Sequence, residues 1–299
     1  MKKIWILFVL LALAATVVAG CGSSKKSSTA ATLSTSTSTS VSSSGGGELA
    51  SEVPAKFKGK TLVVAADATY APNEFVGPNG KTVEGMDVDL ADAIGKELGT
   101  PVKVVNATFD SIIPGLAAGK YGLGISSFTD TKERQKTVDF VTYFSAGTSF
   151  YTKAQGGATV NSLADLCGKT VAVEKGTTQQ TDAEAQSKKC GSNAVKILTF
   201  PDQNGANLAI SSGRAQVGMA DSPVAAYQVK KSGGQFKLTG QPYGTAPYGI
   251  AIPKNTGLDK PILDAVKALM ANGTYNQILS KWGIQSGAIK TPAINAATS

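Results

Sequence analysis

The chain has 299 residues, enough for two domains of ordinary size, with 29 Lys and Arg, 21 Asp and Glu, and no His. Without His, the chain cannot carry out His-based acid–base catalysis, and a zinc site is disfavoured. The net charge is +8, but the basic residues form no long run and no patch interleaved with aromatic residues. This pattern argues against nucleic-acid binding, and we expect no metal and no cofactor.

The first 21 residues are typical of an export signal. Lys2 and Lys3 provide a positive start, and an apolar stretch too short to span a membrane comfortably follows from Ile4 to Val18. Without the two lysines, 27 basic residues (29 minus 2) face 21 acidic ones. The segment from Val18 to Cys21 resembles the lipobox of bacterial lipoproteins, which implies cleavage before Cys21 and lipidation of its thiol. The alternative is a signal peptide that happens to end near a cysteine.

Residues 22–56 are predicted to be a disordered linker. As far as Gly47 they are almost entirely Ser, Thr and Gly, which bury too little apolar surface to offset the entropy of ordering. We expect the folded part to begin near Phe57. Export makes disulfide bonds possible, and the two remaining cysteines, Cys167 and Cys190, are expected to pair.

Strands and helices alternate after Gly59, which predicts an α/β fold with a mostly parallel sheet. Strands are expected over 61–65 and 102–105, and helices over 87–98 and 110–119. The Asn79-Gly80 pair predicts a hairpin between the segments 74–76 and 82–84.

We predict a second lobe that repeats this pattern, because two short segments recur in the same order. The segment 168–173 echoes 59–64, and 212–221 echoes 118–127. Extended segments at 138–152 and 243–253 are predicted to cross between the lobes, and helices at 260–271 and 275–282 to pack on the first lobe. Residues 287–299 are expected to be a frayed tail.

The segment from Ser126 to Arg134 is the strongest candidate for a binding site. It follows a small apolar strand, and Asp130 with Glu133 is typical of a helix start. A helix N-terminus favours an anion, and the Arg134 guanidinium can grip a carboxylate with two hydrogen bonds. The alternative is an ordinary capped surface helix with a solvated Arg.

The second lobe offers matching features. Gly176, Thr177 and Thr178 lead into a predicted helix, which gives a second N-terminus for the same anion. Asp221 ends a predicted strand, with Ser222 expected as the N-cap and Pro223 as the first helical residue. Asp221 can therefore hold an ammonium group or, alternatively, cap the helix. Each lobe would present its strand ends to a shared cleft.

From Gly59 to Gly283 the chain resembles the solute-binding proteins of polar amino-acid ABC transporters, the family 3 proteins that bind lysine, arginine, ornithine, histidine or glutamine. The resemblance rests on five segments and one residue: 67–72, 85–90, 126–134, 176–179, 272–283 and Asp221. It implies two similar α/β lobes joined by two hinge strands, the type II fold of periplasmic binding proteins. The domains expected are a signal peptide at 1–21, a linker at 22–56, lobe 1 at 57–146 and 245–286, lobe 2 at 147–244, and a tail at 287–299.

The resemblance also implies a role for each site residue. Arg134 would hold the α-carboxylate of a free L-amino acid, with Thr129 and Thr178. Asp221 and Ser127 would hold its α-ammonium group, with the carbonyl of Ser126. Tyr70 and Phe109 would pack on its side chain and Asp67 would face the far end. Thr129 replaces a Ser that many members have, and Asn73-Glu74 replaces a more frequent Phe-Glu order, so the role of Glu74 stays open.

The expected function is therefore that of a lipid-anchored receptor on the outer face of the cytoplasmic membrane. It would close as a monomer around a polar, basic or amide-bearing amino acid and deliver it to an ABC permease. Asp67 suits a cationic side chain but can also bond an amide or cap residues 69–70. Two alternatives stay open: an enzyme like the cyclohexadienyl dehydratases, with Glu174 or Glu74 as proton donor, and a sensory domain for a membrane receptor.

Overall fold

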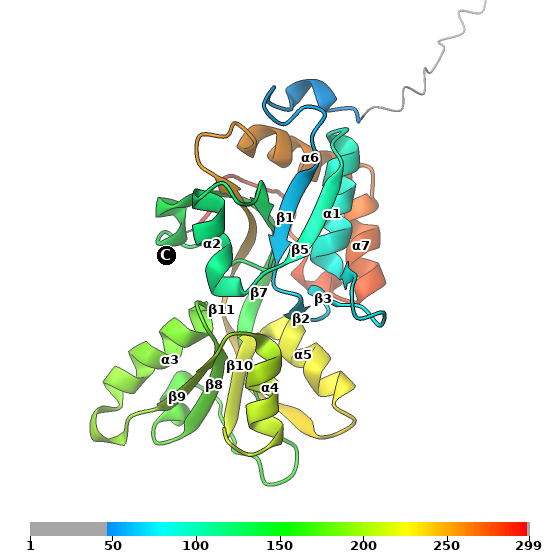
Figure 1. Cartoon of the computed structure of the whole chain (residues 1–299). Coiled ribbons are helices and arrows are strands. Elements are labelled where there is room, and N and C mark those ends of the chain that lie inside the picture. Colours follow the sequence, from blue (N-terminus) through cyan, green and yellow to red (C-terminus); the bar gives the residue numbers. More distant parts are fainter. Residues whose placement is uncertain (1–46, 298–299) are drawn as a thin grey trace, which may run out of the picture. The chain divides into compact units, whose positions relative to one another are not determined.

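Two long antiparallel strands organise the fold, β7 (Val138–Lys153) and β11 (Phe236–Pro253). The computed structural model describes residues 47–297, and Figure 1 shows these two strands running between two groups of helices. They form the centre of one eight-stranded sheet with the order β5-β1-β6-β11-β7-β10-β8-β9. The predicted crossing segments are thus confirmed as strands, although β11 begins seven residues earlier than the expected start at Tyr243.

Lobe 1 lies at one end of this sheet. Its strands β1 (Leu62–Ala66), β5 (Val102–Asn106) and β6 (Leu123–Gly124) are parallel to one another, and β6 pairs with β11. Buried apolar side chains fill both faces of the sheet. The helices of the lobe are α1 (Met86–Glu97), α2 (Phe109–Ala117), α6 (Asp259–Ala271) and α7 (Thr274–Trp282).

A small second sheet extends lobe 1, and it consists of β2 (Thr69–Tyr70), β3 (Glu74–Val76) and β4 (Val83–Glu84). The strands β3 and β4 are antiparallel, with Phe75 opposite Glu84. The hairpin predicted from Asn79-Gly80 is therefore confirmed, and Gly80 takes the positive φ of 69° that such a turn uses.

Lobe 2 repeats the parallel arrangement at the other end of the large sheet. The strands β8 (Thr170–Glu174), β9 (Lys196–Phe200) and β10 (Val217–Asp221) are parallel where they pair, and β10 joins β7. The helices of this lobe are α3 (Thr178–Lys189), α4 (Gln203–Ser211) and α5 (Ser222–Lys231). The expected disulfide is present between Cys167 and Cys190, whose Cα atoms are 5.5 Å apart, and it closes a loop that contains all of α3.

The segment after Ser126 corrects the expected helix. Phe128 and Asp130 pair with β11 instead, because Gly249 N donates to Phe128 O at 2.8 Å and Asp130 N to Pro247 O at 2.9 Å. Only a three-residue 3-10 turn, Arg134–Lys136, forms before β7 begins at Val138. The helix N-terminus proposed there as an anion site does not exist.

Both ends of the described chain are more ordered than expected. Residues 47–56 were assigned to the linker, yet Leu49 N donates to Glu97 O at 3.0 Å and Val53 is 3% exposed in the core of lobe 1. The expected frayed tail pairs with β7, because Thr142 N donates to Ala293 O and Asn295 N to Phe140 O, each at 2.9 Å. Apolar side chains and backbone bonds explain both differences.

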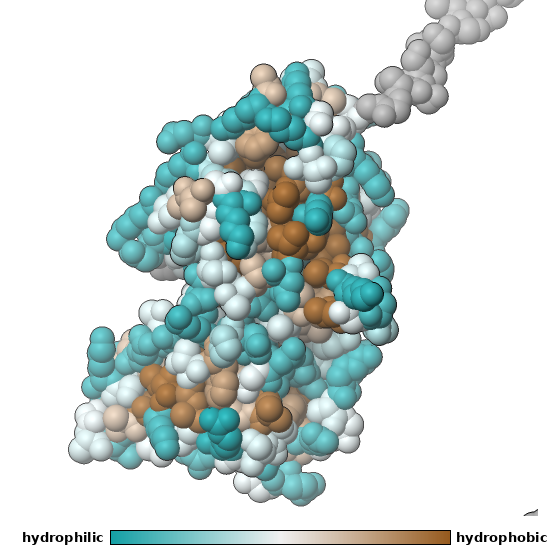
Figure 2. All heavy atoms as spheres, in the orientation of Figure 1, coloured by the Kyte–Doolittle hydropathy of each residue, from teal (hydrophilic) through white to brown (hydrophobic). Residues whose placement is uncertain are grey.

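The export signal, Cys21 and the linker as far as residue 46 lie outside the described residues. Within residues 47–297, no helix has the length and apolar character needed to cross a membrane. Figure 2 shows apolar side chains surfacing over β1 and β5 and again over β8 and β9, with polar residues around them. These patches lie at the two edges of the large sheet, where β5 and β9 each have only one neighbouring strand.

Candidate binding site between the lobes

The carboxyl ends of three parallel strands meet in lobe 1. Asp67 follows β1, and its backbone N–H donates to the Ser126 hydroxyl after β6 at 2.8 Å. Ala68 N donates to Oδ1 of Asn106, the last residue of β5, at 2.9 Å. These hydrogen bonds fix polar side chains at the edge of the sheet, which is where open α/β sheets bind their ligands.

A buried carboxyl pair supports the next turn. Ser127 has a left-handed φ of 51°, and its backbone N–H donates to Asp87 Oδ2 at 2.8 Å. The hydroxyls of Ser126 and Ser127 donate to the two oxygens of Glu74, at 2.9 and 3.2 Å. Tyr143 Oη donates to Asp87 Oδ1 at 2.8 Å. Glu74 therefore holds the Ser126–Ser127 turn in place, which gives a physical role to a residue whose role was open.

Burial determines the charge of this pair. Desolvation and the neighbouring Asp87 carboxylate raise the pKa of Glu74 well above its usual value. Burial likewise raises the pKa of Asp87, to about 6, although hydrogen bonds from Tyr143 and Ser127 oppose the shift. Two adjacent buried carboxyls cannot both be ionised cheaply, so the pair keeps a proton, held by Glu74, near neutral pH.

Arg134 supplies the positive charge of the site. Its Nη1 donates to Thr129 O at 2.8 Å and its Nη2 to Gly176 O, in lobe 2, at 3.0 Å. The guanidinium carbon lies 5.3 Å from the ring centre of Phe109, which stacks on Phe128 at 4.6 Å. Burial lowers the pKa of Arg134 to about 10, so the guanidinium stays charged at neutral pH.

In lobe 2, the start of α3 is positioned by local bonds. Thr177 is the N-cap: its hydroxyl accepts from Gln180 N at 3.2 Å and donates to Glu174 O at 2.7 Å. The Thr177 hydroxyl is thus engaged within its own turn, which leaves the α3 N-terminus and Thr178 to face the cavity.

Asp221 lies at the end of β10 and occupies the N-cap position of α5, one residue earlier than expected, so Pro223 is second in the helix and not first. Its side chain makes no capping bond to α5. Oδ1 accepts instead from Gln179 Nε2 at 2.8 Å. Asp221 is 7% exposed, and burial raises the pKa of its carboxyl group. Asp221 is therefore directed to the site and not to helix capping.

Three hydrogen bonds and one ion pair join the lobes around these groups. Asp221 N donates to Tyr70 Oη at 2.9 Å, and Gln203 N donates to Thr69 Oγ1 at 3.1 Å. The remaining two are the Arg134 bond to Gly176 and an ion pair of 2.7 Å between Lys175 and Asp110. The lobes are thus in direct contact, as in a closed cleft.

The two lobes enclose a narrow cavity between them. The structure brings to it all of the predicted ligand-binding residues: Asp67, Tyr70, Phe109, Ser126, Ser127, Thr129, Arg134, Thr177, Thr178 and Asp221, together with Glu74. It adds Glu174, which sequence reasoning named only as an enzymatic proton donor, and Gln179. Glu174 could have been found as the last residue of a buried strand, directly before the Gly-Thr-Thr turn.

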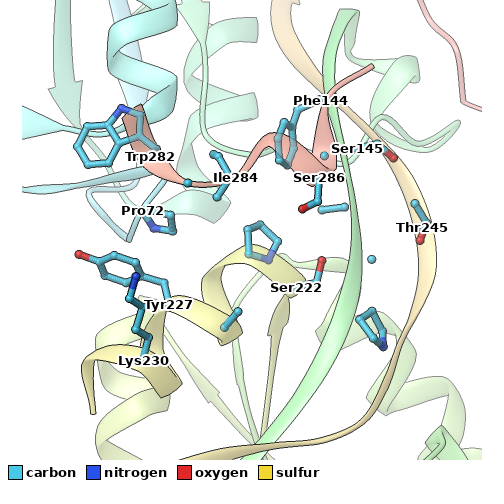
Figure 3. A pocket seen from close by; sticks show the side chains of 17 residues that line it. Pro72, Phe144, Ser145, Ser222, Tyr227, Lys230, Thr245, Trp282, Ile284 and Ser286 are labelled. Carbon is cyan, nitrogen blue, oxygen red and sulfur yellow. The ribbon is translucent and has the colours of Figure 1, made fainter. Parts of the chain in front are cut away.

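A second and larger pocket, with about 1070 Å³ of empty space partly open to solvent, lies beside the hinge strands. Figure 3 shows Ser222, Tyr227 and Lys230 of α5 facing Trp282 and Ile284 across it. Among the described residues that line it, Lys230 is the one charged group and none is acidic. A zwitterion finds no carboxylate among these lining residues to pair with its ammonium group, so the smaller cavity is the better candidate site.

Known proteins share this sequence and fold. The family of bacterial extracellular solute-binding proteins, family 3, matches residues 62–285. The arginine-binding protein ArgT of Corynebacterium glutamicum is 31% identical over 253 residues, 83% of each chain. An ancestral arginine-binding protein solved with arginine is 38% identical, with a TM-score of 0.70 over 74% of this chain and 97% of that one. An ancestral amino acid-binding protein, a precursor of cyclohexadienyl dehydratase, is 37% identical, with a TM-score of 0.67 over 74% of this chain and 95% of its own. The chain therefore belongs to the family 3 bacterial extracellular solute-binding proteins.

Proposed function

We propose that the protein is the amino-acid-binding component of an ABC importer and closes around one free L-amino acid. The observation that carries this proposal is the pairing of opposite charges in one cavity, with Arg134 from lobe 1 and Asp221 from lobe 2. Each lobe alone complements half of a zwitterion. Only the closed cleft pairs both charges, so the ligand shifts the open–closed equilibrium towards closure.

Within this proposal, the α-carboxylate lies against Arg134, Thr129 and the α3 N-terminus at Thr178. Arg134 has five N–H donors, and backbone carbonyls use two of its nitrogens. The α-ammonium group lies against Asp221, the Ser127 hydroxyl and the carbonyl of Ser126. The Thr177 hydroxyl caps α3 and is therefore not assigned to the ligand.

We further propose a preference for a cationic side chain such as that of arginine, lysine or ornithine. The described residues lining the cavity include four carboxyls (Asp67, Glu74, Glu174 and Asp221) and one cation, Arg134. A zwitterion uses Arg134 and Asp221, and Glu74 keeps a proton, so Asp67 and Glu174 are the carboxyl groups left to favour a further positive charge. The arginine-binding names of similar proteins support the same choice.

The cellular location of the protein is also proposed from its sequence. We propose that lipidated Cys21 and residues 22–46 tether the receptor, as a monomer, to the outer face of the cytoplasmic membrane beside its permease. We propose that the chain passes from lobe 1 to lobe 2 between residues 146 and 147, and returns to lobe 1 between residues 244 and 245. The register shifts between β7 and β11 on either side of Tyr243, and the close approach of Gly147 to Tyr243 O, support a hinge there.

A thermal-shift panel tests the function. Purified protein is heated with each of the twenty common amino acids, ornithine and citrulline, and hits are measured by calorimetry. A ligand at a hundred times its Kd adds about 2.7 kcal/mol to the free energy of unfolding. Arg134→Ala should abolish the shift, whereas Arg214→Ala, which removes an exposed arginine outside the cavity, should leave it intact. No shift with any amino acid on folded protein would refute the receptor.

One observation favours a second candidate, a dehydratase. Glu174 is 2% exposed, and burial beside Asp67 raises its pKa well above the usual value, which suits a proton donor. The similarity to a precursor of cyclohexadienyl dehydratase points the same way. Turnover of prephenate or arogenate, lost in Glu174→Gln, would establish the enzyme, and binding without turnover would exclude it.

A further inference from the structure

Glu174 is the least satisfied charged side chain of the cavity. It ends β8, is 2% exposed, and its Oε1 has no hydrogen-bond partner among the described residues. A buried carboxyl oxygen without a partner is costly, and such groups usually meet a ligand or an ion. Lys175, the next residue, does not serve it, because its Nζ pairs with Asp110.

Asp67 faces Glu174 from the other lobe. Asp67 Oδ1 accepts from Thr69 Oγ1 at 2.6 Å and Oδ2 from Phe109 N at 3.0 Å, so its orientation is fixed within lobe 1. Both carboxyls line the same cavity, and each affects the pKa of the other. Two acids from opposite lobes therefore face the same cavity, one held by hydrogen bonds and one with an unpartnered oxygen.

The titratable groups that surround Asp67 and Glu174 are mostly acidic. The titratable groups around Glu174 or along the same cavity are Asp67, Glu74, Asp202, Asp221, Tyr70, Tyr151 and Arg134, with the neighbouring Lys175 already paired. If Arg134 holds the α-carboxylate of a ligand, no cation among the described lining residues is left to neutralise Asp67 and Glu174.

We infer that Asp67 and Glu174 together form the subsite for the cationic end of the ligand side chain, and that Glu174 sets the preference for cationic over neutral amino acids. This inference rests on the proposed amino-acid-binding function. A guanidinium or ammonium group there pairs with both lobes at once, so the ligand side chain contributes to closure along with the zwitterion.

A ligand with a neutral side chain leaves Asp67 and Glu174 without a cation between them. Closure then brings two carboxylates together, and one of them must take up a proton, because burial beside Asp67 raises the pKa of Glu174. Binding of a neutral amino acid should therefore be accompanied by proton uptake and should strengthen as the pH falls. Binding of arginine should not require that proton.

Arginine and citrulline provide the matched test, because they differ mainly in the charge of the terminal group. Calorimetry on purified full-length protein measures the ratio of their affinities in the wild type, in Glu174→Gln, and in Glu184→Gln. Glu184 is exposed on α3, outside the cavity, so its change removes the same charge from lobe 2. We expect Glu174→Gln to lower the arginine-to-citrulline ratio by roughly 10- to 100-fold. Glu184→Gln should leave the ratio unchanged.

Proton uptake is a second readout that needs no variant. Titrations of the wild type with citrulline and with arginine, in two buffers of different ionisation enthalpy, give the number of protons bound. About one proton more for citrulline than for arginine supports the subsite. An unchanged affinity ratio in Glu174→Gln, or equal proton uptake for both ligands, overturns the role of Glu174 and leaves the amino-acid receptor standing. Failure of the wild type to bind any amino acid instead refutes the proposed function.

Discussion

Tyr70→Phe separates two roles of one residue, its contact with the ligand and its contact with the opposite lobe. The ring remains in the cavity wall, but the hydroxyl that accepts from Asp221 N at 2.9 Å is lost. Both residues are buried, at 6% and 7% exposure, so the Asp221 N–H loses its partner without gaining access to water in the closed cleft. An unsatisfied buried donor costs about 1–3 kcal/mol. Only the closed state carries this cost, because water reaches the N–H when the lobes separate.

Ligand affinity should therefore fall by about 5- to 150-fold in Tyr70→Phe. The thermal stability of the ligand-free protein should stay close to that of the wild type. Calorimetry with the best ligand of the panel measures the first quantity, and ligand-free thermal unfolding measures the second. Tyr227→Phe, which removes a hydroxyl in the pocket beside the hinge, is the matched control. An affinity within about twofold of the wild type would show that the Tyr70–Asp221 bond does not stabilise closure.

Two further predictions concern stability. The pKa of Asp87 is raised from 3.8 to about 6, so the folded state binds more protons than the unfolded state in that range. The free energy of unfolding should thus fall by up to about 3 kcal/mol as the pH rises from about 4 to about 6, and Asp87→Asn should flatten that slope in urea titrations at several pH values. An equally steep slope in the variant would contradict this. Replacing Cys167 and Cys190 by Ser opens a loop with a sequence separation of 23, which should lower the free energy of unfolding by about 3 kcal/mol. Ligand affinity should be unchanged, because neither cysteine lines the cavity, and a loss below about 1 kcal/mol in urea unfolding would show that the loop is held by other contacts.

The gathering of the site residues was predictable from local patterns. Asp67 and Ser126 lie within two residues of the ends of the parallel strands β1 and β6, whose carboxyl ends share one edge of the sheet, and Asp221 ends β10 in the other lobe. The hairpin at Asn79-Gly80 is equally local, because that pair strongly favours the tight turn.

What depended on distant contacts was not predictable. The segment after Ser126 has the residues of a helix start, but pairing of Phe128 and Asp130 with β11 takes precedence over that local preference. Residues 287–299 are predicted to be a frayed tail, but Thr142 and Phe140 of β7 provide backbone partners for Ala293 and Asn295. The proposed role of Glu174 depends on its nearness to Asp67, which is more than a hundred residues away in sequence and in the other lobe.

The order of the sheet also bears on the sequence in which the two lobes fold. The strands and helices of lobe 2 are contiguous in sequence between β7 and β11. Lobe 1 is interrupted in sequence by lobe 2. Its strand β6 pairs with β11, which is made after lobe 2. Its helix α1 contacts α7, where Trp282 Nε1 donates to Asp89 at 2.7 Å across 193 residues. Contacts of such sequence separation form late, because a long loop must close first. Lobe 2, which is made second, has all of its partners available before lobe 1, and a chain stalled before α7 would expose the apolar face of α1 to proteases and chaperones.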